Sequence, residues 1–278
     1  MKHIIQSFIF AGAIVASVVP PPATQAQTVY AEDMATSPAI QVLRRTEKLG
    51  LHTIELVFYG PSRDQLAVYA DRLRKQLKAH LLLLQQWQSA PVEISAASSE
   101  FYPLFKVLKT TCIETQGALN PLDVPLREAW GFTPGSLSYG VPDTRVRQRW
   151  SEQLREQGCE AIAPGQRLTL DYFAAGWLID QSKALLGSAG IVAAKLRIDN
   201  VAYYAGAPPQ AKAWKVPVYH PRKADQLIQY FYLQDQSLVL LGDAETHFYA
   251  NGLRYPDFLD SRTGNVHSET AGAYVLST

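Results

Sequence analysis

The chain has 278 residues, of which 47% are hydrophobic and 18% are charged. This length and composition allow one large globular domain or two small ones. The 26 Lys and Arg residues nearly balance the 25 Asp and Glu residues, which gives a formal net charge of +1, and no block of like charge stands out. We therefore expect no nucleic acid or other polyanion among the partners.

The first 31 residues have the layout of a secretory signal peptide. Lys2 precedes an apolar run over residues 4–19, and small and polar residues follow. Cleavage is expected after Ala26 or Ala31. The apolar run is short for a bilayer span, so an uncleaved membrane anchor is the less favoured alternative. The predicted location is the periplasm, with membrane contact only through this segment if it stays uncleaved.

Two cysteines, Cys112 and Cys159, belong to this exported chain. Disulfides form in exported proteins, so a bridge between them and two separate buried thiols are both open. A zinc site is not expected, because no histidine cluster accompanies the cysteines.

After an expected linker over residues 32–48, a single domain is predicted for residues 49–278. Residues 51–60 have the pattern of a strand. Ser62 and Gln65 have the spacing of a capping box at the start of a helix. Apolar residues at helical spacing follow and predict one buried face, made by Leu66, Tyr69, Leu73, Leu77, Leu81 and Leu84.

A second helix is predicted for residues 99–116, before a Pro- and Gly-rich loop region that ends in a surface helix over Arg145–Gln157. Residues 168–170 then alternate like a short strand, with a helix from about Phe173. The rest of the chain reads as strands and hairpins. This order predicts an α+β domain with helices packed on a largely antiparallel sheet.

Generic motifs assign no reaction to the sequence. The nucleophile elbow, the phosphate-binding loop and the paired-glycine fingerprint are all absent. His52 lies in a predicted strand, where a structural role is expected. Asp257 and Asp260 lie near Arg262, in an arrangement typical of a structural turn.

Five segments, taken in order, resemble the FAD:protein FMN transferase (ApbE-type) family. The segments are "TQGALNPLDVPLREAWGF", "LTLDYFAAGWLID", "WKVPVYHP", "LLGDAE" and "YPDFLDSRTGN". The resemblance runs from about Thr53 to the end of the chain. It implies an ApbE-like (T-fold-like) domain in an exported bacterial protein. Members of this family use Mg²⁺ to transfer FMN from FAD onto a Thr or Ser of a target protein.

The resemblance also implies a set of cofactor-binding residues, for which structural roles are the alternative. The residues are Thr115, Asp180, Asp243, Asp260, Arg262 and Thr263. No catalytic residue and no metal ligand is assigned. The family pattern continues into a helix whose Asp and Thr hold Mg²⁺, whereas this sequence ends at Thr278, so a truncated product is a further reading.

Several departures from the family pattern fall at polar positions. Asp171 and Tyr172 stand where the family has two glycines, and Ala175 stands where it has a lysine. A carboxylate there repels phosphate, and the cation nearest the flavin nucleotide is lost. Asn120 replaces an Asp, and Asp257 replaces a His.

Two functions follow as hypotheses. The first is an FMN transferase-like protein that acts with FAD and Mg²⁺ on a periplasmic acceptor, with weak or absent activity because of these substitutions. The alternative is an inactive family member that binds flavin or a protein partner in a periplasmic redox system.

Overall fold

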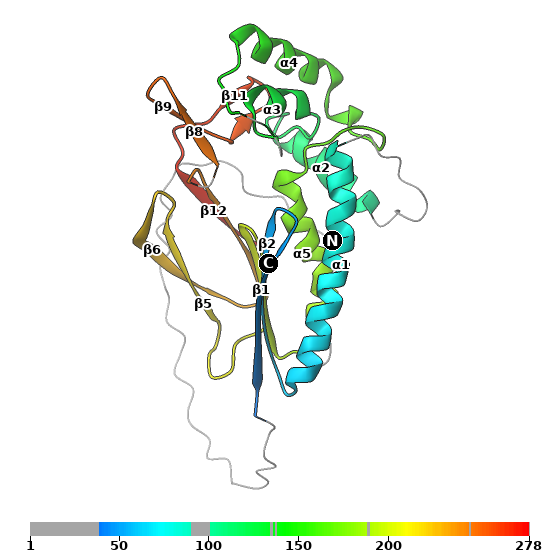
Figure 1. The fold of residues 1–278 in the computed structure, drawn as a ribbon, viewed down its shortest axis with the longest axis vertical. Helices are drawn as coiled ribbons and strands as arrows, with labels where there is room; N and C mark the ends of the chain where they lie inside the picture. The colour runs from blue at the N-terminus through cyan, green and yellow to red at the C-terminus, as the bar shows by residue number, and fades with distance from the viewer. Residues whose placement is uncertain are drawn as a thin grey trace.

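The computed structural model describes residues 39–89, 101–133, 136, 138–187, 190–244 and 246–277. The predicted signal peptide, the first part of the predicted linker, Glu245 and Thr278 lie outside these residues. The ribbon has a central sheet, a layer of helices on one face and a hairpin on the other (Figure 1).

The central sheet has six antiparallel strands in the order β1-β2-β3-β4-β7-β12. Most of these strands pair with the strand that follows them in the sheet's chain order, as in the β1–β2 hairpin, where Leu49 lies opposite His52. The strands are β1 (Gln41–Leu49), β2 (His52–Gly60), β3 (Ala193–Ile198), β4 (Val201–Ala205), β7 (Gln236–Gly242) and β12 (Gly272–Ser277). Strand β2 is buried over much of its length, because it lies inside the sheet.

Two long helices, α1 (Arg63–Ser89) and α5 (Asp171–Leu186), pack on one face of this sheet (Figure 1). The predicted stripe of α1 is confirmed: five of its leucines are buried, and Tyr69 packs against the same core. At the start of α1 the Gln65 N–H donates to Ser62 Oγ at 3.4 Å. Helix α2 (Tyr102–Glu114), which confirms the second predicted helix, completes this layer and buries Leu104, Phe105, Leu108 and Cys112. Among the described helices, none is long and apolar enough to cross a membrane.

The opposite face of the sheet is covered by a hairpin of β5 (Trp214–His220) and β6 (Lys223–Leu233). Its inward side chains, including Val216 and Val218, meet Tyr204 and Leu238 of the sheet in a second apolar cluster. Burial alternates along β5, as in a strand with one face on the core.

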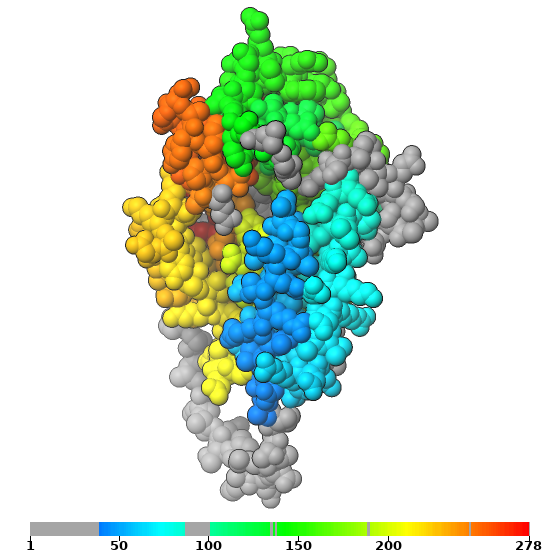
Figure 2. Space-filling model, viewed as in Figure 1, coloured from blue at the N-terminus to red at the C-terminus, as the bar shows by residue number. Residues whose placement is uncertain are grey.

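A smaller layer caps one end of the sheet, where Figure 2 shows the green helices beside the orange hairpin. It contains helices α3 (Val124–Trp130) and α4 (Thr144–Gln157), hairpin β8 (His247–Ala250) and β9 (Leu253–Pro256), and the short pair β10 (Leu259–Asp260) and β11 (Asn265–Val266). A third apolar cluster around Trp130 and Leu126 joins these elements.

Three sequence predictions are wrong in detail. Residues 41–48 of the expected linker form most of strand β1. The charged segment "RRTEK" does not look like a strand in sequence, because β1 lies at the edge of the sheet and most of its side chains are exposed. Residues 168–170 are not a strand, since the Thr169 N–H bonds to the carbonyl of Pro121 rather than to a sheet. The Pro-rich middle contains α3, which tolerates Pro125 because the proline lies in the first turn of the helix.

The predicted fold class is confirmed, because helices pack on a largely antiparallel sheet. Cys112 and Cys159 form a disulfide that joins α2 to the short helix η2 (Cys159–Ala161). This result decides between the two alternatives left open by the sequence.

Candidate functional site

Two of the family-like segments, far apart in sequence, meet at the end of the sheet. The Ser261 N–H donates to the carbonyl of Ala118 at 3.0 Å. The Ser261 hydroxyl donates to Asp123 Oδ2 at 3.1 Å, and Trp130 Nε1 donates to the carbonyl of Gly264 at 2.9 Å. The turn after β10 is thus held against the loop that follows α2.

Asp260 and Arg262 of this turn form a bidentate ion pair. Arg262 donates from Nε to Oδ1 at 2.9 Å and from Nη2 to Oδ2 at 2.6 Å. Burial by itself raises the pKa of Asp260, but the hydrogen bonds and charge of Arg262 outweigh it and hold that pKa below 3.8. Thr263 Oγ1 accepts the N–H of Asn265 at 3.2 Å. Arg262 remains partly open to solvent, so its free N–H groups could meet an anion.

Thr115 ends helix α2 in a structural role. Its hydroxyl donates to the carbonyl of Thr111 at 2.8 Å and accepts the N–H of Leu119 at 3.1 Å. The next two residues, Gln116 and Gly117, have positive φ angles of 52° and 83°. Only glycine adopts such angles freely, and the reversal that they create directs the chain toward residues 118–121.

Asp243 directly follows strand β7 and lies in a different environment from the 260–264 turn. Its carboxylate is fully buried between Arg222, whose Nε donates at 3.0 Å, and Arg254, whose Nε lies 3.0 Å from Oδ2. Burial raises the pKa of Asp243, but the two guanidinium groups more than offset this and lower it below its usual value. Both carboxylate oxygens are therefore already occupied by the protein.

Asp180 lies apart from the other predicted residues, in the middle of α5. Its carboxylate pairs with Lys183 at 2.8 Å, three residues further along the same helix. Lys183 in turn lies over the ring of Tyr203, 4.8 Å from its centroid. The structure thus places Asp260, Arg262 and Thr263 in one turn, held against the segment that directly follows Thr115, and leaves Asp180 and Asp243 outside that group.

The start of α5, where the family-like pattern has glycines, is filled by side chains. Tyr172 packs beneath the guanidinium of Arg127, 5.1 Å from the ring centroid. Arg127 Nη1 donates to the Tyr172 hydroxyl at 2.9 Å, and this hydroxyl donates to the carbonyl of Asp257. Asp171 lies 3.4 Å from Arg127 Nη2. Burial raises the pKa of Tyr172 to about 12, so the hydroxyl stays protonated.

Arg127 is the site residue that the sequence reasoning missed. It is only 2% exposed, on a helix that the sequence pattern did not predict. Asp123 and Arg127 have the i,i+4 spacing of a helical ion pair, which is the signal that could have found them. Asp123 is also buried, and its burial raises the pKa of the carboxyl despite the nearby charge of Arg127.

Little room for a flavin exists beside Tyr172 in this conformation. The cavity there has a volume of about 10 Å³ and is lined by residues that include Asn120, Asp123, Thr169 and Tyr172. This volume holds about one water molecule. Ala175, at the position of the family lysine, is buried in the main core, 6% exposed. The described residues therefore fit a flavin nucleotide here only if Tyr172 moves.

The described residues do not fit the Mg²⁺ that the family resemblance implies. Mg²⁺ needs several oxygen ligands in near-octahedral geometry. No group of three or more His, Cys, Asp or Glu side chains among the described residues could hold a metal ion. Asp180, Asp243 and Asp260 are each paired with a cationic side chain instead.

His52 and Asn120 have structural roles. His52 Nδ1 shares a hydrogen bond of 2.6 Å with Asp199 Oδ2, and Asp199 Oδ1 accepts the N–H of Thr53 at 2.8 Å. This confirms the structural role that was expected for His52. Asn120 Oδ1 accepts the N–H of Leu122 at 3.0 Å within its own turn.

Comparison with known proteins places this chain in a family of flavin transferases. The model of the ApbE family matches residues 53–278, so the chain belongs to the ApbE family. A curated relative, the FAD:protein FMN transferase of Vibrio cholerae serotype O1, is 27% identical over 171 residues. This match covers 58% of the chain and 51% of the relative, so the chain spans about half the length of this relative.

Solved structures share the fold. The ApbE protein of Thermotoga maritima has a TM-score of 0.69 at 21% identity, over 85% of this chain and 82% of that one. The flavin transferase ApbE of Vibrio cholerae has a TM-score of 0.65 at 19% identity, with the same coverage of 85% and 82%. The apo form of the flavinyl transferase ApbE of Pseudomonas stutzeri scores 0.62 at 19% identity, over 85% and 80%. At this level of identity the likeness concerns the fold.

Proposed function

We propose that this chain is an FAD:protein FMN transferase-like protein that handles FAD in the periplasm and modifies an exported acceptor at a strongly reduced rate. The observation that supports this most is the meeting of residues 115–118 with the turn at 260–264, held by the Ser261–Ala118 hydrogen bond. Both segments resemble those of the family, and the relative's name supports FAD as the donor.

In the proposed transfer, the hydroxyl oxygen of a Thr or Ser on the acceptor bonds to the FMN phosphorus. The pyrophosphate bond of FAD breaks, AMP leaves, and the hydroxyl proton passes to solvent. Such a step depends on positive charge placed where the phosphate charge develops. Arg262 is the site's partly exposed cation, but it is paired with Asp260. We assign no step to Mg²⁺. Because the charge of Arg262 is already paired, we expect the transfer to be slow.

The mature protein, FAD, Mg²⁺ and an acceptor peptide with one Thr provide the test. We expect a slow rise of flavin-modified peptide, measured by mass spectrometry. A peptide with Ala in place of that Thr is the control. The transferase proposal is wrong if the Thr peptide gains no flavin while the protein is folded.

The proposal includes export, on the basis of the N-terminal sequence. The purified periplasmic protein should begin at residue 27 or 32. An N-terminal peptide that still contains Lys2 in the mature protein would contradict cleavage.

A second candidate function is a non-catalytic flavin- or partner-binding protein, favoured by the side chains at the start of α5. Tyr172 occupies that turn and Asp171 adds a negative charge near Arg127. FAD binding without transfer in the same assay would support this candidate over the first.

The triple change Asp171→Gly, Tyr172→Gly and Ala175→Lys tests whether these side chains block the nucleotide. We expect FAD affinity to rise at least tenfold, because about 1.4 kcal/mol of repulsion and steric hindrance is removed. Fluorescence titration with FAD provides the measurement. Unchanged affinity, with circular dichroism showing a folded variant, would mean that the turn is only a packing element.

A further inference from the structure

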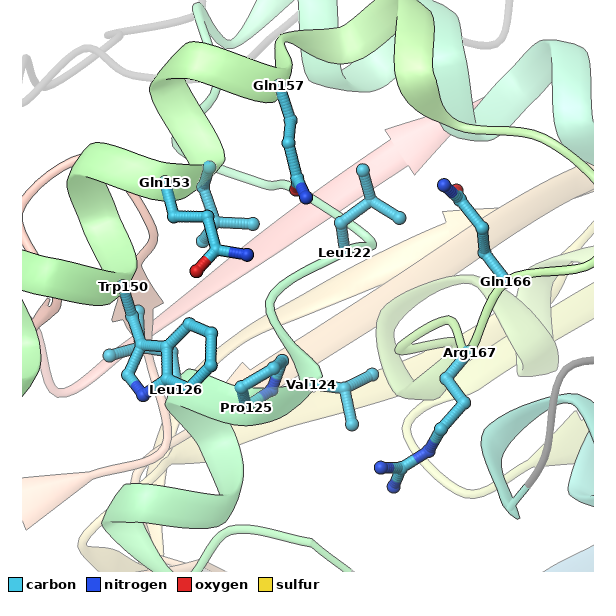
Figure 3. A pocket seen from close by; sticks show the side chains of 10 residues that line it. Leu122, Val124, Pro125, Leu126, Trp150, Gln153, Gln157, Gln166 and Arg167 are labelled. Atoms are coloured by element: carbon cyan, nitrogen blue, oxygen red, sulfur yellow. The ribbon is translucent and has the colours of Figure 1, made fainter.

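A larger cavity lies between α3 and α4, and Tyr172 is not among its lining residues. It has a volume of about 280 Å³ and is bounded by α3, α4 and the segment before α5. Figure 3 shows Leu122, Val124 and Pro125 along one side of it, with Trp150 at one end. The lining is therefore largely apolar, as in most small-molecule sites.

Three amide side chains surround this apolar lining. Gln153 and Gln157 reach toward the cavity from α4, and Gln166 approaches from the opposite side (Figure 3). Gln166 Oε1 is buried and has no hydrogen-bond partner among the described residues. The structure shows no hydrogen bond from the amides of Gln153 and Gln157 to any described residue. The exposed amides of Gln153 and Gln157 offer a ligand both hydrogen-bond donors and acceptors, whereas Gln166 Oε1 is shielded and meets a ligand only after its side chain turns.

The charges at the cavity exclude a strongly charged ligand. Among the residues that the structure describes, no carboxylate lines it, and the one charged lining residue is Arg167. Arg167 is already paired with Glu128 at 2.6 Å. An uncharged ligand therefore matches the lining better than a phosphate or an ammonium group.

The arrangement of hydrogen-bond donors and acceptors in the amides indicates the class of ligand. A glutamine amide presents a donor and an acceptor side by side, and it pairs with a ring that has the same two groups adjacent. Trp150 lines the cavity with an aromatic ring, and the Arg149 guanidinium lies over this ring at 5.4 Å from its centroid, which leaves at most the other face for stacking. The volume is at the lower end of the range for small-molecule sites, which suits one or two fused rings and excludes a dinucleotide.

We propose that the cavity between α3 and α4 binds an uncharged planar heterocycle with a cyclic amide group, such as a purinone or pyrimidinedione ring. This site is separate from the proposed flavin site, and the proposal does not depend on flavin binding.

Titration of the mature protein with hypoxanthine, followed by ligand-observed NMR, tests this proposal. Indole is the matched control ligand, since it has two fused rings without a carbonyl group. We expect saturable binding of hypoxanthine and at least tenfold weaker binding of indole, because each missing hydrogen bond costs a several-fold loss of affinity.

The double variant Gln153→Leu, Gln157→Leu removes two of the amides. Both residues are exposed on α4, so the fold should survive, which circular dichroism checks. We expect hypoxanthine affinity to fall about tenfold or more. Gln148→Leu, on the same helix but outside the cavity lining, should change it less than about twofold. No saturation up to about 10 mM, equal binding of indole, or an unchanged affinity in the double variant would each overturn the proposal.

Discussion

Tyr172 and Arg127 give the family-like turn at the start of α5 a structural role, because they are hydrogen-bonded to each other there. In sequence, Tyr172 looks like a lost glycine. In the structure it links α3, α5 and the carbonyl of Asp257 through a single hydroxyl group. The substitution therefore adds packing and hydrogen bonds where the resemblance implies open backbone. It also explains why Arg127 can be almost fully buried, since Tyr172, Asp123 and Asp171 surround its charge.

Asp243 also acts at the scale of one residue, and its pairing predicts a dependence of stability on pH. Its pKa in the folded state lies below the ordinary value of 3.8. The stabilisation that it contributes is therefore present above the unfolded-state pKa and is lost as the pH falls through the folded-state pKa. Asp243→Asn should lower the free energy of unfolding at pH 7 by about 3 kcal/mol, because two arginines lose their counter-charge.

Urea unfolding at several pH values between 7 and 2 measures this effect. The variant should also lose less stability than the wild type below pH 4. Asp180→Asn is the control, because its pair with Lys183 is exposed and should contribute less than about 1 kcal/mol. Equal acid sensitivity of Asp243→Asn and wild type would contradict the prediction.

At the scale of elements, the disulfide is the covalent link between the sheet-packing helices and the end layer. Cys112 is buried on α2, and Cys159 lies just after α4, 47 residues later. Lys109 and Glu160 form an ion pair at 2.9 Å beside it. The bridge fixes where α4 ends relative to α2, and α3 lies on the connection between them.

Removing the bridge should destabilise the fold considerably. For the variant Cys112→Ala, Cys159→Ala we expect the free energy of unfolding to fall by ~4 kcal/mol, from the entropy of closing a loop of 47 residues. Urea unfolding with and without a reducing agent measures it. The reductant should destabilise only the wild type, and an equal response of both proteins would count against a structural disulfide.

At the scale of the whole molecule, β1 determines where the domain begins. It pairs with β2 over its full length and buries Leu43 and Leu49 against the main core. Glu47 also pairs with Arg74 of α1 at 2.6 Å. The folded unit therefore includes residues that the sequence assigns to a linker.

Two truncated proteins test this boundary. A chain that starts at residue 39 should melt like the mature protein. A chain that starts at residue 50 should melt about 6–12 °C lower, because two buried leucines and two ion pairs to α1 are lost and the edge of β2 is exposed. Thermal melts by circular dichroism compare the two. Identical melting temperatures would show that β1 is not part of the stable unit.

The sequence by itself determined the long amphipathic helices, most of the hairpins and the family. These features are encoded locally, in the leucine spacing of α1 or in ordered motifs such as "SRTGN". It also identified the segments that meet at the site, as the Ser261–Ala118 contact shows.

Only the tertiary structure decided which residues share an environment. Strand β1 is charged and is stabilised by its partner strand, and α3 is short and has Pro125 in its first turn, so local patterns did not predict either element. The structure separates Asp243, which lies between Arg222 and Arg254, from Asp260, which pairs with Arg262. It also brings Arg127 onto Tyr172, 45 residues apart. Burial and ion pairing depend on distant neighbours, and the spacing of residues along the chain does not record them.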